Sequence, residues 1–513
     1  MQNTRTNKAK LLAITSLLRQ IISILLNFLS RTIFIQMLGA EYLGLNGLFT
    51  NILSILALSE LGIGAAISFY LYKPIADSNQ DRIKSIMHFY KLCYRFVGTF
   101  IILAGILCLP FLKYLVKFES TISINLQLVF MLYIFNTSAT YFLYSYKQTL
   151  AYASQEGHKI EKYNIVFSFV SCIVDCIILC VFKNYYVYLV QKFVVILLKN
   201  LYIGAIIDKR YPYLRSKNYT KLSKVEIKSI LKDVANISIY KIGSALYSAT
   251  DNIIISAIIG TIVVGYYSNY SLIIAQILMV INLISNSFVA GIGNVMAKET
   301  HEKKLQIFYE LDLCLYGFIF VSSLLLVQLL NPFISIWVGS VDHNYVLPFY
   351  IVCIIVFNFF LDTSILILTA FREGSGHFEI GRKAQLYGGI VNIVLSIILG
   401  KRYGLAGIFI STSICKLFIT ILPIVFKTAI KVFNVSSIKM MIYYLSRLLL
   451  LVVGCFIEIA LSCKIPYTGI DGLIIRGLIS ILVSIVLFLA VYSRTDAFKS
   501  LAKRIKTEFI LRR

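Results

Sequence analysis

Polar and charged side chains recur at helical spacing inside the long apolar runs of this sequence. In the first run they follow one another at intervals of three or four residues: Thr15, Arg19, Ser23, Asn27 and Ser30, with Arg31 next. This spacing places them on one face of a helix. A charge within a membrane span costs about 2.5–3.5 kcal/mol, so such groups usually face protein or water. The stripe therefore predicts a polar surface inside a membrane.

Other apolar runs carry similar stripes, and we expect them to line one wet central cavity shared by two halves of the chain. The polar groups that we expect to bind substrate are Arg19, Asn27, Arg31, Asn46, Lys241 and Tyr247. The carboxylates that we expect to take up a proton or a sodium ion are Glu60, Asp251 and Asp362. No catalytic residue and no metal ligand is expected.

Three cations in such a cavity favour an anionic substrate, because guanidinium pairs bidentately with phosphate. Tyr could stack against sugar faces, although interfacial belts are the commoner place for this residue. In the alternative interpretation each charge forms a structural salt bridge between helices, such as Arg31 with Glu60. Further cations nearer the span ends are interpreted as snorkelling to headgroups: Arg95, Lys192, Lys199, Lys416, Arg447 and Arg476.

The composition indicates that these stripes lie in membrane-spanning helices. The 513 residues are 58% hydrophobic and only 14% charged, whereas soluble domains carry about a quarter charged residues. Apolar runs of about twenty residues predict an all-α integral membrane protein with about fourteen helices. We expect them at 11–37, 43–72, 92–116, 122–147, 161–182, 185–207, 233–259, 262–292, 312–338, 345–371, 383–400, 403–427, 441–463 and 468–493.

The distribution of basic residues predicts the orientation of these helices. Roughly 34 of the 49 Lys and Arg fall in the two tails and the even-numbered connections, and roughly 6 fall on the other side. We therefore expect both termini in the cytoplasm. The first run has no small-residue cleavage site and is read as an uncleaved helix.

A repeated glycine spacing suggests two related halves. The turn at 39–44 reads GAEYLG and the turn at 260–265 reads GTIVVG, an offset of 221 residues. We expect two pseudo-repeated six-helix bundles plus two C-terminal helices. The predicted divisions are a bundle at 1–207, a basic cytoplasmic linker at 208–232, a second bundle at 233–427, and two helices with a basic tail at 428–513. Transporters often contain such repeats, with substrate near the midplane.

Other function classes fit this sequence poorly. The charge of +25 does not indicate nucleic-acid binding, because no soluble basic module is present. The glycines at 291–293 and 374–376 lack the strand and the Lys that a nucleotide loop requires. A membrane enzyme such as a glycan polymerase needs acid–base groups in a sizeable outer loop, and the expected outer loops have only a few residues.

Several segments resemble bacterial oligosaccharide-repeat-unit flippases. They lie at 31–49 (RTIFIQMLGAEYLGLNGLF), 58–64, 71–76, 250–256 (TDNIIIS), 264–270 and 291–295. These flippases form the polysaccharide transporter branch of the multidrug/oligosaccharidyl-lipid/polysaccharide exporter superfamily. The resemblance spans nearly the whole chain, and it carries no family-wide catalytic set to place on these residues.

The resemblance implies two helical bundles around a V-shaped cavity that work by alternating access. The implied substrate is an undecaprenyl-pyrophosphate-linked oligosaccharide, moved to the outer leaflet of the bacterial plasma membrane. The implied energy source is a proton or sodium gradient, with no bound cofactor. Besides membrane lipid, glycan polymerase and glycosyltransferase partners are expected, for capsule, O-antigen or another exopolysaccharide. A peptidoglycan-precursor flippase stays an alternative, as does a multidrug antiporter, which is disfavoured because the first helix has cations and no acid.

Overall fold

The protein is helical throughout the part of the chain that the structure describes. The computed structural model describes all residues except 1, 61, 118–123, 144, 217–218, 378, 463–468 and 512–513. Of some further helical residues it describes only the backbone: 2–10, 12–13, 59, 65, 236–237, 239–241, 244–245, 248, 290, 294, 297–298, 462 and 504–511. Within the described residues, ten helices are long and apolar enough to cross a membrane, or eleven if one bent pair counts as a span. The chain is therefore a multi-pass membrane protein.

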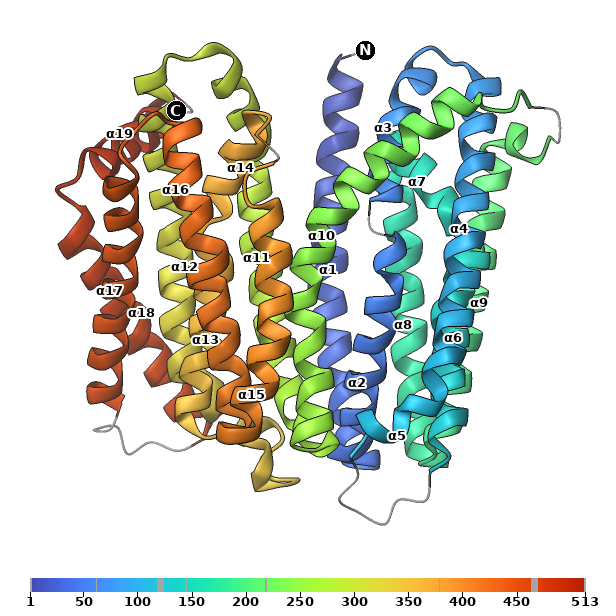
Figure 1. Cartoon of the computed structure of the whole chain (residues 1–513), viewed down its shortest axis with the longest axis horizontal. Helices are drawn as coiled ribbons and strands as arrows, with labels where there is room; N and C mark the ends of the chain where they lie inside the picture. Colours follow the sequence, from blue (N-terminus) through green and yellow to red (C-terminus); the bar gives the residue numbers. More distant parts are fainter. Residues whose placement is uncertain are drawn as a thin grey trace. The chain divides into compact units, whose positions relative to one another are not determined.

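The chain divides into two compact units, of which unit 1 comprises Met1–Gly265. Its helices appear in blue to green in Figure 1. They are α1 (Gln2–Leu38), α2 (Ala40–Leu56), α3 (Ile63–Ala76), α4 (Gln80–Cys108), α5 (Leu112–Leu115), α6 (Leu126–Phe142), α7 (Tyr146–Ala153), α8 (Gly157–Phe182), α9 (Tyr185–Arg210), α10 (Lys224–Ile258) and the first turn of α11 (Thr261–Lys298). The short 3₁₀ turns are η1 (Ala57–Glu60), η2 (Leu109–Phe111) and η3 (Pro212–Arg215).

The starts of three helices in unit 1 follow from local capping chemistry. Asn79 and Asn184 precede α4 and α9, and each side chain accepts a hydrogen bond from a backbone N–H of the first turn. Before α10, Ser223 and Glu226 form a reciprocal capping box. Such caps satisfy backbone donors that a helix start leaves without an intrahelical partner. Polar residues before the apolar runs therefore fix where α4, α9 and α10 begin.

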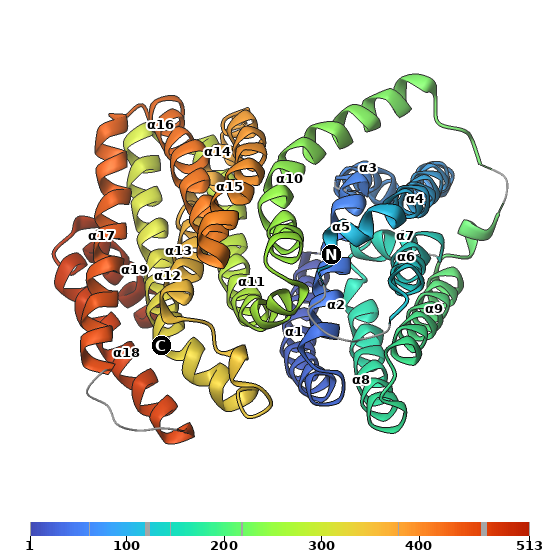
Figure 2. The same ribbon diagram turned by 60° about the horizontal axis from the view of Figure 1, so that its bottom comes forward.

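Unit 2 comprises Tyr266–Arg513 and appears in yellow-green to red in Figure 2. It contains the rest of α11, then α12 (His301–Trp337), η4 (His343–Tyr345), α13 (Phe349–Ser364), α14 (Leu366–Gly374), α15 (Arg382–Ile414), the π-helix η5 (Cys415–Ile421), α16 (Leu422–Lys431), α17 (Ser437–Ser462), α18 (Ile470–Tyr492) and α19 (Asp496–Leu511). α12 is the central helix, since it packs against α13, α17, α18 and α19.

The helix α15 is a hairpin of two arms. Gly404 has φ 60°, a left-handed conformation that breaks the helical geometry and that glycine adopts at little cost. The apolar stretch that includes both arms, Arg382–Lys431, has 50 residues. A straight helix of that length would extend about 75 Å, far beyond the roughly 30 Å of hydrocarbon. The chain therefore turns back at Gly404, as the separate predictions of 383–400 and 403–427 require.

Some of the segments predicted as single helices are broken. The segment 43–72 contains α2, η1 and α3, with Gly62 at φ 103° beside the break. The segment 122–147 holds α6 and part of α7, whose axes differ by 44°, and 345–371 holds α13 and α14. The total of fourteen spans stays a prediction. So do the predicted divisions at 207, 232 and 427, although contacts place all of α10 in unit 1.

The two glycine turns that repeat at an offset of 221 residues meet one another in unit 1. A Cβ atom on Gly44 would lie 1.9 Å from the carbonyl oxygen of Thr261, and one on Gly265 would lie 2.2 Å from that of Ala40. Ala40 and Thr261 are themselves 221 residues apart. The contact is therefore reciprocal, as between two related repeats, and only glycine leaves room for the backbones. Small residues allow such close helix packing in membranes.

Replacing Gly44 with alanine is expected to destabilise the protein by about 1–3 kcal/mol, the usual cost of overpacking. The new methyl group has backbone atoms, not flexible side chains, in its way. The matched control is Gly293→Ala in α11, where a Cβ atom would meet nothing within 4 Å. Thermal unfolding in detergent measures both. Equal unfolding temperatures for Gly44→Ala and the wild type would contradict the close contact.

Candidate functional site

The predicted polar stripe of α1 is present, and its first cation is paired. The Nε atom of Arg19 lies 2.6 Å from Oε2 of Glu161 on α8. Glu161 also accepts a hydrogen bond from the hydroxyl of Tyr152 at 2.9 Å. Arg19 keeps 36% of its side chain exposed. Its charge is therefore largely balanced within unit 1, as the alternative interpretation of structural salt bridges expects.

Two further α1 candidates lie toward the other end of the helix. Asn27 is exposed, and its amide donates to Ser23 at 3.4 Å. Arg31 is half-buried and follows Ser30, whose hydroxyl donates to Asp175 on α8 at 3.0 Å. Asp175 in turn forms an ion pair of 2.6 Å with Lys192 of α9. The part of the stripe near the C-terminal end of α1 therefore borders a polar cluster that joins three helices.

Glu60 lies at the break between α2 and α3. Its two carboxylate oxygens accept hydrogen bonds from Tyr94 at 2.6 Å and Tyr141 at 2.5 Å. Tyr90 donates to Tyr94, and its hydroxyl also lies 3.1 Å from that of Thr149. The predicted example of a structural salt bridge, Arg31 with Glu60, is therefore wrong: tyrosine hydroxyls hold this carboxylate. Such a group inside an apolar segment can exchange a proton or bind a small cation.

The other unit 1 candidates are distributed over α2 and α10. Asn46 is half-buried and accepts a hydrogen bond from Thr50 at 3.3 Å. Tyr247 and Asp251 are both buried on α10, which packs against α2. The side chain of Lys241 lies outside the described residues. The structure thus brings several candidates into one helical unit but does not gather them around one point.

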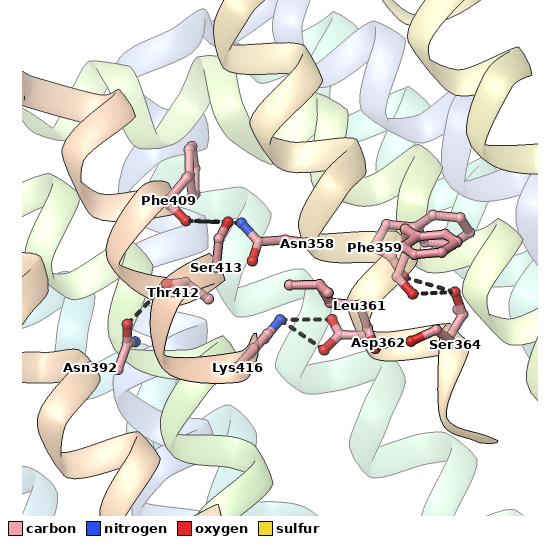
Figure 3. Close-up of polar contacts among 12 residues, drawn as sticks. Asn358, Phe359, Leu361, Asp362, Ser364, Asn392, Phe409, Thr412, Ser413 and Lys416 are labelled. Atoms are coloured by element: carbon pink, nitrogen blue, oxygen red, sulfur yellow. Dashed lines mark hydrogen bonds and ion pairs between the residues drawn. The ribbon is translucent and has the colours of Figure 1, made fainter. Parts of the chain in front are cut away.

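The candidate of unit 2, Asp362, is bound by a lysine (Figure 3). Both carboxylate oxygens lie 2.8 Å from Nζ of Lys416. Lys416 is 14% exposed and Asp362 is 43% exposed. An exposed charge at this depth of an apolar segment normally faces protein or water rather than lipid. One turn earlier on α13, Asn358 donates to the carbonyl of Phe409 at 3.0 Å.

Lys416 lies on the π-helix η5. A π-helical segment is rare, and it often marks a functional position because it shifts the side chains that follow it. Here it follows the second arm of α15 directly and carries the lysine toward α13, as Figure 3 shows. The local distortion therefore positions the cation of the pair.

A buried amide holds the two arms of α15 together. Asn392 on the first arm accepts hydrogen bonds from Ser411 at 3.2 Å and Thr412 at 3.1 Å on the second. The three side chains are almost fully buried. Hydrogen bonds across such arms have no water to compete with them in a bilayer. Asn392 therefore fixes the helix that delivers Lys416 to Asp362.

Sequence reasoning missed the partners of several cations. Snorkelling is the wrong interpretation for Lys192, Lys416 and Arg447, each of which has a carboxylate partner. Arg447 is 1% exposed and lies 2.6 Å from Asp312, and its guanidinium stacks over Tyr443 at 4.1 Å. For Lys416, the sequence did carry a signal that it has a partner: this cation lies in an apolar run that also contains small polar residues. Nothing in the sequence pairs residues 312 and 447.

One comparison with known proteins shows the family of this chain, and another shows its fold. A family model described as polysaccharide biosynthesis protein matches residues 13–290. The comparison with curated proteins gave no match. Among solved structures, the lipid II flippase MurJ in an inward closed conformation has a TM-score of 0.66 and 16% identity, and covers 94% of this chain and 99% of its own.

Two further structures share the fold. An inward-facing multidrug resistance MATE family transporter of the MOP superfamily has a TM-score of 0.61 and 14% identity, over 85% of this chain and 98% of its own. A MOP superfamily transporter from Pyrococcus furiosus has a TM-score of 0.56 and 13% identity, over 83% and 96%. The predicted all-α transporter fold is therefore confirmed.

Proposed function

The chain belongs to the polysaccharide biosynthesis protein family, and we propose that it is a flippase for lipid-linked oligosaccharides. In this proposal it moves undecaprenyl-pyrophosphate-linked repeat units from the inner to the outer leaflet of the bacterial plasma membrane. The observation that carries the proposal is the family match over 13–290 on a fold shared with flippases and exporters. Both termini lie in the cytoplasm in this proposal, in accord with the distribution of Lys and Arg.

The proposed mechanism is alternating access driven by an ion gradient. Spans that break at a polar group are typical ion sites of transporters, and η1 places Glu60 at such a break. Protonation or cation binding there would remove the charge that Tyr94 and Tyr141 stabilise. Asp362 is a weaker candidate for coupling, because Lys416 already neutralises it. Asp251, buried on α10, is the remaining candidate carboxylate.

Arg31 is the residue of α1 that we propose to meet the pyrophosphate. Arg19, whose guanidinium pairs with Glu161, is the second α1 arginine that we propose for the substrate path. Asn27 on α1 and Asn46 on α2 offer neutral polar groups. In this proposal, glycosyltransferases supply the substrate before flipping, and a glycan polymerase uses the product after it.

Complementation tests the substrate. In a strain that lacks its own repeat-unit flippase, the wild-type chain is expected to restore surface glycan. In a strain depleted of its peptidoglycan-precursor flippase it is expected not to restore growth. The reverse pattern would identify the peptidoglycan precursor, and drug resistance without either effect would identify a multidrug exporter.

In the same strain, Arg31→Ala is expected to lower surface glycan about tenfold or more, because a charge-assisted hydrogen bond contributes about 1.5–3 kcal/mol. Arg31→Lys should retain part of the activity. The control is Arg494→Ala, an exposed arginine beyond the end of α18. Normal glycan in Arg31→Ala, at equal protein level, would remove Arg31 from the substrate path.

A further inference from the structure

A basic cavity lies at one end of unit 1, apart from the candidates described above. Its volume is about 570 Å³. It is formed by the first turns of α4, the start of α7, the end of α9, the end of η3 with Ser216, and Tyr219. The charged side chains that line it are Lys84, Lys91, Lys147, Asp208 and Arg215. By the distribution of Lys and Arg, this end is the predicted cytoplasmic end.

The charges of this cavity do not balance. Among the described residues that line it, Asp208 is the one carboxylate, and it lies 2.5 Å from Lys147 and 3.9 Å from Arg215. Lys84 pairs with Asp81, a residue that is 75% exposed to solvent. Among the described side chains no ion pair or hydrogen bond is found for Lys91. Four cations therefore face two carboxylates, and the excess positive charge favours an anion.

The walls suit a ligand larger than a single phosphate. Two of the lining residues, His88 and Tyr219, stack their rings at 4.3 Å. Tyr146, which is 7% exposed, is a further aromatic lining residue. Pockets of 300–1,000 Å³ hold small-molecule ligands, so this cavity has room for a diphosphate together with a further group.

We propose that this cavity is a binding site for a phosphate-bearing anion, in which Lys91 and Arg215 contact the phosphate oxygens. Lysine and arginine both bind phosphate, as a point charge and as a planar fork respectively. The anion can be a lipid headgroup or a soluble diphosphate, since both present the same oxygens. The site does not depend on which glycan the protein carries.

Aromatic contacts connect this site with Glu60. Tyr146 lies 6.1 Å from Tyr90 and 6.4 Å from Tyr94, measured between ring centroids. Tyr94 donates directly to Glu60 at 2.6 Å. An anion against Tyr146 thus lies two side chains from the proposed coupling carboxylate.

The test uses the full-length protein in two arms. In detergent, calorimetric titration measures the binding of inorganic pyrophosphate. In nanodiscs, the unfolding temperature is compared between phosphatidylglycerol and phosphatidylcholine. The variant is Lys91→Gln/Arg215→Gln, and the matched control is Lys209→Gln, an exposed lysine beside Asp208 that does not line the cavity.

We expect the wild type and the control to respond to at least one anion and the double variant to bind it about tenfold more weakly, because two charge-assisted contacts are lost. Lys91→Arg should keep the response. If the double variant does not fold, the single variant Lys91→Gln takes its place. A response to phosphatidylglycerol only identifies a headgroup; a response to pyrophosphate only identifies a soluble ligand. An unresponsive wild type, or a double variant that responds like the wild type, overturns the proposal.

Discussion

Replacing Glu60 with glutamine is expected to reduce export of the lipid-linked glycan about tenfold or more, because an intramembrane carboxylate that relays ions cannot be replaced by a neutral group. Glutamine has nearly the same shape, and its carbonyl oxygen can still accept a hydrogen bond from Tyr94 or Tyr141. The fold at the break between α2 and α3 should therefore persist. Surface glycan measures the loss, and protein level verifies folding.

The tyrosines make this prediction specific. Tyr94→Phe and Tyr141→Phe each remove one donor to Glu60 and should each lower export less than Glu60→Gln. The control is Glu299→Gln, an exposed carboxylate after α11 that should export normally. The ion gradient is collapsed and then restored, and export is measured again. Recovery of export by Glu60→Gln to the wild-type level would show that Glu60 is not the coupling group.

Replacing Asp362 with asparagine is expected to destabilise unit 2, because it breaks the ion pair with Lys416. It leaves the ammonium of Lys416, which is 14% exposed, beside a neutral amide with one oxygen in place of the charged carboxylate that binds it. A lysine near the middle of a span costs on the order of 2.5–3.5 kcal/mol on insertion scales. The unfolding temperature in detergent should therefore fall, and the amount of protein in the membrane with it.

A double variant separates the pair from its members. Asp362→Asn/Lys416→Gln removes both charges and should recover much of the stability, since a broken pair costs more than a missing one. The coupling free energy from this cycle should be about 0.5–3 kcal/mol. Additive effects of the two single variants would show that the contact in Figure 3 contributes nothing.

The apolar runs and the break points were predictable to different degrees. The runs depend on local composition, so every predicted segment contains a helix. The breaks depend on backbone geometry at single residues. Gly62 and Gly404 are visible in the sequence, but glycine is common in membrane helices, so their left-handed conformations were not predicted. The π-helix that carries Lys416 leaves no sequence signal at all.

The partners of intramembrane charges were the least predictable part of the site. Asp312 and Arg447 are 135 residues apart, and Glu60 and Tyr141 are 81 apart. Helical spacing reports which residues share a face but not which helix that face meets. The sequence therefore indicated that Glu60 and Asp362 need partners, and only packing determines that tyrosines serve one and a lysine the other.

The buried amide of Asn392 also bears on how the chain enters the membrane. Its carbonyl is satisfied by Ser411 and Thr412, which are synthesised only after the turn at Gly404. A lone first arm would expose this amide to hydrocarbon, at a cost of several kcal/mol for an unsatisfied polar group. The first arm should therefore wait at the insertion machinery until the second emerges, and both should pass into lipid as one hairpin.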